Sequence, residues 1–289
     1  MVRRSALIAA LALTPVAARA QAPAPVATAP ASAVPARFKW KAGEVLTYKV
    51  TQHTAVRETS LDEKTEKPVT TEARTNLALV KKWAVKDVDD KGVATLEMTI
   101  TSMKTEFLKP DGTSVVRDSA VPDQAKDLAS FLNTPILTVK VDPQGKLLDV
   151  KESKAGSAAR LHAELPFRFV LPDSVTVATG QTWDRAFTLK LDPPLGTGES
   201  HDFAQKYTGS VKDGLVAIGV ATTLKTPPKA LSEQVPLVPM LWTGEVYFNP
   251  TLGRYHAARL KVKAELPNHQ GEGTKFEYES AYVEDVVEE

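Results

Sequence analysis

The chain has 289 residues, of which 43% are hydrophobic and 25% charged, so it has enough apolar material for a globular core. It contains no cysteine, which excludes disulfides, thiol catalysis, thiolate metal sites and a lipid anchor on a cysteine. Three of the 36 basic residues lie in the first twenty; the other 33 basic and 35 acidic residues give a formal charge of −2. This balance argues against nucleic acid or an anionic membrane surface as the main partner.

Residues 1–20 have the pattern of a cleaved signal peptide. Arg3 and Arg4 precede an apolar run of about a dozen residues, and Ala18-Arg19-Ala20 forms a small-x-small cleavage signal. The run is short for a membrane span, so we expect cleavage after Ala20, no transmembrane segment afterwards, and a periplasmic or extracellular location. Residues 21–37 are rich in proline and alanine and are expected to form a disordered linker.

Residues 38–152 are predicted to form a β-rich first half. Leu46, Tyr48 and Val50 alternate with polar residues, and residues 94–101 alternate more regularly still. A period of two places the apolar side chains on one face of a sheet and the polar ones on the other. A hairpin is predicted later in this half, over residues 136–151, with its turn at Asp142-Pro143-Gln144-Gly145.

Two helices are predicted between strands. Residues 119–133 have apolar side chains at helical spacing, with Ser119 as the expected N-cap and Pro135 beyond the end. A connecting helix is expected over residues 153–164, before Pro166.

Residues 165–289 are predicted to form a β-rich second half that resembles the first. The clearest element is the hairpin of residues 241–266, whose turn at 249–253 combines proline with glycine. Strand patterns in residues 180–191 and 207–220 follow in the same order as those of the first half. The hairpin connections predict a mainly β protein whose two similar halves form a curved antiparallel sheet, half-barrel or sandwich-like, with one or two short covering helices.

No pattern of catalytic or cofactor-binding residues stands out. Ser200, His201 and Asp202 are adjacent, but catalytic triads are assembled from residues distant in sequence, and no glycine follows as a nucleophile elbow requires. The five histidines include no pair at metal-binding helical spacing, and no nucleotide-binding glycine motif occurs. We therefore expect no cofactor, no metal site and no catalytic residue.

Four residues are candidates for lining a ligand site: Trp83, Trp183, Trp242 and His256. The tryptophans lie in predicted strands, where indole rings could line an apolar groove. Alternatively, they fill the core, as large aromatic side chains commonly do. The alternation after the 249–253 turn places His256 on the inward face with Leu260, where it would be either a ligand contact or a buried structural histidine.

Four short motifs together resemble an uncharacterised group of secreted or lipid-anchored bacterial envelope proteins classed as domains of unknown function. They are FKWKAGEVLTYKV (38–50), VDPQGKLLDV (141–150), LPDSVTVATGQTWD (171–184) and GEVYFNPTLGRYHAARL (244–260). The resemblance implies an envelope location and β-rich structure, and it supplies no catalytic residues. The predicted architecture is also similar to the half-barrel carriers of lipoproteins and lipids, although a fold alone does not define a function.

Three functions remain open at this point. The first is an exported, non-catalytic protein that binds a hydrophobic small molecule or an envelope protein on the curved sheet. The second is a structural or assembly module of the cell envelope, and the third is a hydrolase acting through Ser200.

Overall fold

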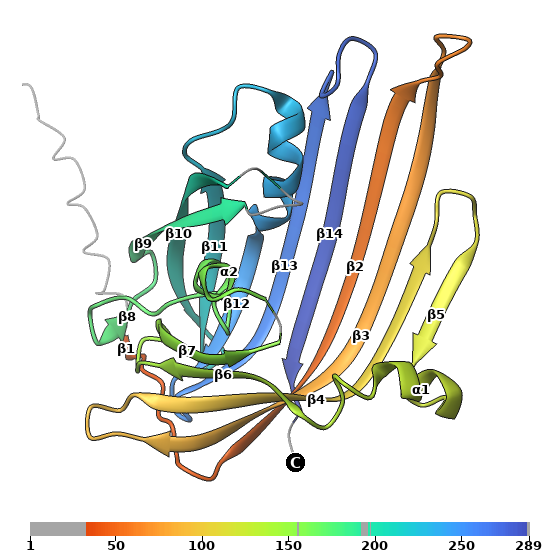
Figure 1. Ribbon diagram of the computed structural model, residues 1–289. Coiled ribbons are helices and arrows are strands. Elements are labelled where there is room, and N and C mark those ends of the chain that lie inside the picture. The colour runs from red at the N-terminus through yellow and green to blue at the C-terminus, as the bar shows by residue number, and fades with distance from the viewer. Residues whose placement is uncertain (1–32, 155, 192–195, 197, 288–289) are drawn as a thin grey trace, which may run out of the picture. The chain divides into compact units, whose positions relative to one another are not determined.

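The computed structural model describes residues 33–154, 156–191, 196 and 198–287. The predicted fold class is confirmed: the chain is mainly β, with a large curved antiparallel sheet and few helices (Figure 1). The expected signal peptide and residues 21–32 of the expected linker lie outside the described residues. Within the described ranges, no helix is both long enough and apolar enough to span a bilayer.

Eleven of the sheet's twelve strands form two meanders of five strands with one strand between them, and the twelfth, β5 (Ser114–Asp118), pairs with β4 beside this path. The first meander comprises β2 (Val45–Leu61), β3 (Pro68–Val88), β4 (Ala94–Leu108), β6 (Pro135–Val141) and β7 (Leu147–Ser153). The second comprises β9 (Thr182–Leu191), β10 (Glu199–Lys212), β11 (Leu215–Leu224), β12 (Thr243–Asn249) and β13 (Arg254–Pro267). β14 (Lys275–Val286) pairs with β13 and with β2, giving the order β7-β6-β4-β3-β2-β14-β13-β12-β11-β10-β9.

The element order agrees with two similar halves. After its third strand, each meander has an insertion: β5 (Ser114–Asp118) and α1 (Pro122–Leu128) in the first, and the 3-10 helix η1 (Leu231–Met240) in the second. Each meander also follows a two-residue strand, β1 (Val34–Pro35) or β8 (Thr176–Val177). These two short strands pair with each other, so the halves meet at their starts as well as through β14.

Alternation along β14 defines the two faces of the sheet. Phe276, Tyr278, Ser280, Tyr282 and Glu284 are buried, whereas the side chains between them are exposed or half-buried. The buried set lies on the concave face, which holds the core, and the other face meets solvent. Strand register therefore assigns each residue of the neighbouring strands to one face or the other.

The helix α2 (Ala158–Glu164) lies between the two ends of the sheet. It packs against β7 at one end and β9 at the other. The Ser157 hydroxyl accepts the N–H of Arg160 at 3.3 Å and caps the helix start. At the helix end, Arg185 of β9 donates to the carbonyl oxygen of Ala163 at 3.0 Å. The connecting helix thus bridges the two edge strands of the open sheet.

The segment from Leu165 to Leu171, here called the interior segment, runs through the concave side of the sheet. Leu165, Phe167, Phe169, Val170 and Leu171 are all buried. The Phe167 ring lies 5.5 Å from Tyr255, and the Phe169 ring lies 6.3 Å from Phe248. Truncating either phenylalanine to alanine would cost about 3–5 kcal/mol, so this segment is a central part of the core.

The predicted helices are shorter than expected. α1 covers residues 122–128 of the expected 119–133, and its N-cap is Val121 rather than Ser119. The Ser119 hydroxyl instead accepts the N–H of Met103 at 2.9 Å, which holds it against β4. Likewise Ser153 ends β7, so the connecting helix begins only at Ala158.

The expected linker also extends too far. Val34 and Pro35 form β1, Ala36 is fully buried, and Arg37 donates to the carbonyl oxygen of Asp173 at 2.8 Å. A Pro/Ala composition carries no sign of this pairing, because β1 depends on a partner far away in sequence, β8.

Gly244 lies where the backbones of β12 and β13, the last two strands of the second meander, pack closely together. Its φ is +141°, and a Cβ there would lie 2.1 Å from the Arg259 carbonyl oxygen of β13. We expect Gly244→Ala to lower the free energy of unfolding by at least about 1–3 kcal/mol, because backbone must shift. Gly219→Ala on the adjacent β11 is the control, since its Cβ meets only ordinary contacts at 3.6 Å or more. Denaturant unfolding monitored by tryptophan fluorescence measures both, and equal losses would contradict the expectation.

Candidate functional site: the concave face of the sheet

The three tryptophans predicted to line a ligand site all contact the interior segment. Trp83 lies 5.6 Å from the Phe167 ring, and the Arg168 guanidinium lies 5.7 Å from the Trp242 ring. The Trp183 indole donates to the carbonyl oxygen of Val170 at 2.8 Å. The space between these three tryptophans is therefore occupied by the chain itself. Their geometry is that of core packing, the alternative that the sequence left open.

His256 is not on the inward face that the alternation predicted. A β-bulge in the β12–β13 pairing sets Phe248 against Tyr255 and Tyr247 against Ala257, so His256 is the extra residue. Tyr255 takes the buried position, and His256 is half-buried beside a surface hollow near the end of β14. A bulge changes the alternation by one residue, and strand pattern alone does not reveal it.

The Ser200-His201-Asp202 run lies in β10 and is not assembled as a catalytic site. Neighbouring residues of a strand point to opposite faces, so the serine and histidine side chains diverge. Asp202 instead accepts the Thr188 hydroxyl at 2.7 Å across to β9. Among the residues that the structure describes, no group of three or more His, Asp or Glu side chains could hold a metal ion.

A buried ionic cluster lies on the concave face between β3, β14 and β13. Glu284 is fully buried, and its Oε1 lies 2.8 Å from Lys81 Nζ, which makes the two an ion pair. Its Oε2 accepts the hydroxyls of Tyr282 at 2.5 Å and Tyr255 at 3.0 Å. Tyr48 in turn donates to the Tyr255 carbonyl oxygen at 3.1 Å. A carboxylate removed from water needs such partners to remain charged.

The tyrosines of the cluster remain neutral at physiological pH. Burial, together with the negative charge of Glu284, raises the pKa of Tyr48, Tyr255 and Tyr282 well above the usual value. Protonated hydroxyls can donate, which is what Glu284 requires from Tyr255 and Tyr282.

Arg168, in the interior segment, lies directly over this cluster. Its guanidinium is 5.1 Å from the Tyr282 ring centroid as well as 5.7 Å from that of Trp242. One of its N–H groups donates to Glu164 of α2 at 3.4 Å, and its side chain keeps 20% of its surface exposed. Arg168 has a φ of +67° and Leu165 a φ of +60°, values that are unusual and strained for residues other than glycine.

Beyond the cluster, the concave face continues as an apolar strip that the helices leave largely uncovered. We call it the concave strip; register places on it Val56, Leu77, Leu79, Met103, Phe107 and Val115. Phe107 is 40% exposed and Val115 39% exposed, and the other members are half-buried. The main helix contacts lie elsewhere: α1 with β5, α2 with β7 and β9, and η1 with β13 and β14. Figure 1 shows the long strands β13, β14, β2 and β3 continuing side by side past α2.

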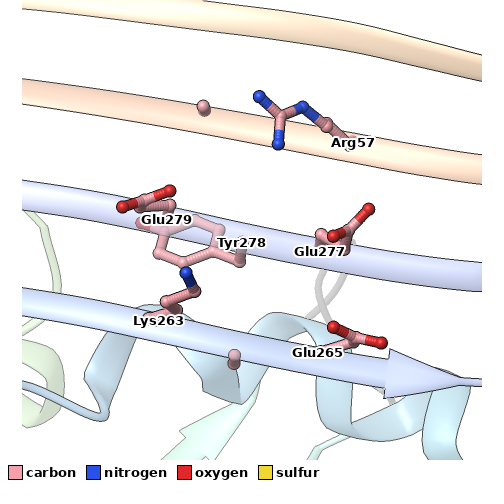
Figure 2. Close-up of a pocket in the computed structure, with 8 residues that line it drawn as sticks. Arg57, Lys263, Glu265, Glu277, Tyr278 and Glu279 are labelled. Atoms are coloured by element: carbon pink, nitrogen blue, oxygen red, sulfur yellow. The ribbon is translucent and has the colours of Figure 1, made fainter.

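The opposite face of the same strands is polar. A shallow hollow there is bordered by Arg57 of β2, Lys263 and Glu265 of β13, and Glu277 and Glu279 of β14 (Figure 2). Opposite charges pair along it, for example Lys275 with Glu277 at 3.1 Å. This is the solvent face that the alternating charges predicted, and it brings together no chemistry beyond surface ion pairs.

Sequence reasoning missed the buried cluster, although the sequence contains a signal for it. Lys81 stands two residues before the inward Trp83, and Glu284 two residues after the inward Tyr282. By alternation both belong to the apolar face, where an ionisable residue must have a partner. Their pairing was not predictable, because 203 positions separate them and β2 lies between their strands.

No protein-family model matches the chain, and no curated protein sequence matches it. Solved structures do match, among them that of DynF from the dynemicin biosynthesis pathway of Micromonospora chersina. That chain is 10% identical, with 94% of this chain and 92% of DynF covered, at a TM-score of 0.19. A likeness at this level carries no argument about the present protein. The class defined here is therefore structural: a mainly β protein built on an open, curved antiparallel sheet.

The buried ion pair gives a stability test. We expect Lys81→Met to lower the free energy of unfolding by about 3–5 kcal/mol, because it leaves the Glu284 carboxylate buried without a countercharge. Adding Glu284→Gln should recover most of the loss, since the neutral amide can still accept from the tyrosines. Lys86→Met, on the same strand, is the matched control: its pair with Glu97 is exposed, and its loss should cost under about 1 kcal/mol. Equal losses for the two lysines in denaturant unfolding would contradict a special role for Lys81.

Proposed function

We propose that this protein is an exported, non-catalytic binding protein that holds a hydrophobic ligand on the concave face of its sheet. The observation that carries the proposal is the concave strip, where apolar side chains of four neighbouring strands share one face and remain partly exposed, with the polar side chains of Gln52, Thr54, Thr75 and Thr105 among them. Globular proteins seldom leave a continuous apolar surface uncovered unless something binds to it.

The site differs from the one expected from the tryptophans. Trp83, Trp183 and Trp242 enclose the interior segment, so the proposed ligand contacts are the strip residues farther along β2 to β5. The strip lies next to the buried ionic cluster: Leu79 of β3 pairs with Val50 of β2, which pairs with Glu284 of β14. A ligand on the strip would therefore extend an apolar surface that the core already begins.

Export is part of the proposal and rests on the signal-peptide pattern of residues 1–20. We expect the protein from its native cells to lack these residues and to begin at Gln21. Intact-mass measurement under denaturing conditions, together with fractionation of the cells, would test this. Recovery of the full 289-residue mass from the cytoplasmic fraction would contradict it.

Two adjacent valines of β5 provide a matched test of the binding face. Val115 pairs with Phe107 on the concave strip, whereas Val116 pairs with Glu106 on the other face, and their exposed fractions are 39% and 40%. A carboxylate on the strip would have to be desolvated under an apolar ligand. Val115→Asp should therefore weaken binding of the neutral dye Nile red by about tenfold or more, and Val116→Asp should leave it unchanged.

Native mass spectrometry of the protein purified from the cell envelope complements this titration. A bound apolar small molecule, depleted in Val115→Asp and retained in Val116→Asp, is the expected result. If neither the dye nor any co-purifying molecule binds the folded protein, the carrier function is wrong. Crosslinking in cells to an envelope protein through the same strip would then favour the assembly module instead.

A further inference from the structure

We infer that Arg168 recognises the acidic head of the ligand, and that the ligand is a monoanionic amphiphile such as a long-chain carboxylic acid. This inference rests on the proposed function and adds to it the chemical class of the ligand.

The first argument is the hydrogen-bonding capacity of Arg168. A guanidinium carries five N–H donors in a planar fork that matches a carboxylate. Among the described residues, its contacts are the single bond to Glu164 at 3.4 Å and a contact with the Tyr282 hydroxyl. Cation–π contacts with the Trp242 and Tyr282 rings fix the position of the guanidinium. Several of its N–H donors remain available for hydrogen bonds to a ligand.

The second argument is the charge of the surrounding groups. Glu164 is shared between Arg168 and Arg160, with the Arg160 contact at 2.8 Å, and Glu284 is paired with Lys81. These connected groups comprise three cations and two carboxylates. One further negative charge would bring the net charge of these groups to zero. A doubly charged phosphate would leave one negative charge in excess, so the charge balance favours a monoanionic ligand.

The third argument is the position of Arg168 relative to the concave strip. Its neighbour Tyr282 pairs with Gln52 of β2, which pairs with Leu77 of β3, so one row of the sheet connects them. Strands lie about 4.8 Å apart, so Leu77 is about 10 Å from Tyr282 along this row. A head at Arg168 would thus let an alkyl chain lie on Leu77, Leu79 and the rest of the strip.

The fourth argument is the strained backbone of the interior segment. Two residues other than glycine, Leu165 and Arg168, have left-handed φ values within four positions. Such conformations persist where the surrounding structure holds them, and they concentrate at ligand-binding positions. Here the result is that Arg168 projects toward Tyr282 while its neighbours Phe167 and Phe169 are buried in the core.

The test compares palmitate with hexadecanol, which share the alkyl chain and differ in the head. Titration calorimetry on the full mature chain should show palmitate binding about tenfold or more tightly than hexadecanol, as expected for charge-assisted hydrogen bonds. Arg168→Met keeps the apolar stem over Trp242 and Tyr282 and should abolish this preference while hexadecanol binding remains. Arg168→Lys keeps the charge without the fork and should give an intermediate preference.

Controls separate this inference from the proposed function. Arg57→Gln, on the solvent face of β2, should keep the full preference for palmitate. If wild-type protein binds neither compound, the proposed function fails. Arg117 of β5 is the alternative cation, because register places it on the same face as Val115, opposite Thr105. If wild-type protein binds both compounds equally, or if the preference survives Arg168→Met and is lost instead in Arg117→Gln, the role of Arg168 is wrong. Circular dichroism checks that each variant is folded. If Arg168→Met does not fold, Arg168→Lys decides: a preference for palmitate as strong as that of the wild-type protein overturns the inference.

Discussion

The structure depends on the interior segment filling the concave side of an open sheet. All four tryptophans contact it: Trp40 and Trp83 lie against Phe167, Trp242 against Arg168, and Trp183 against Val170. An open sheet of twelve strands has one apolar face to cover, and here a stretch of seven residues between the two meanders covers its centre. The strands that continue past this segment keep their apolar side chains partly exposed and form the concave strip, the surface of the proposed ligand site.

The same segment brings charge into the core. Arg168 is the one cationic residue of a stretch that is otherwise apolar, and it lies over Tyr282, whose hydroxyl is bonded to Glu284. Buried ionic groups are rarely favourable for stability compared with well-packed apolar side chains. Their presence beside a partly exposed apolar strip is easier to understand if they recognise a ligand than if they only hold the fold together.

Strand alternation predicted the fold class. It identified the hairpins turning at 142–145 and 249–253, the similarity of the halves and the solvent face, because each follows from residues close in sequence. It failed at His256, where a bulge changes the parity, and at β1, whose partner is distant. It also left the role of the tryptophans open, since a buried indole facing a ligand and one facing Phe167 have the same sequence pattern.

One consequence follows from the position of β14. The final strand in chain order occupies the centre of the sheet, and pairs with β2 at a separation of more than two hundred residues. Because the chain is synthesised from its N-terminus, β2 keeps one unpaired edge until β14 has been made. Native assembly of the sheet is therefore a late event, and until then the unpaired edge of β2 is the part of the sheet most open to pairing with another chain.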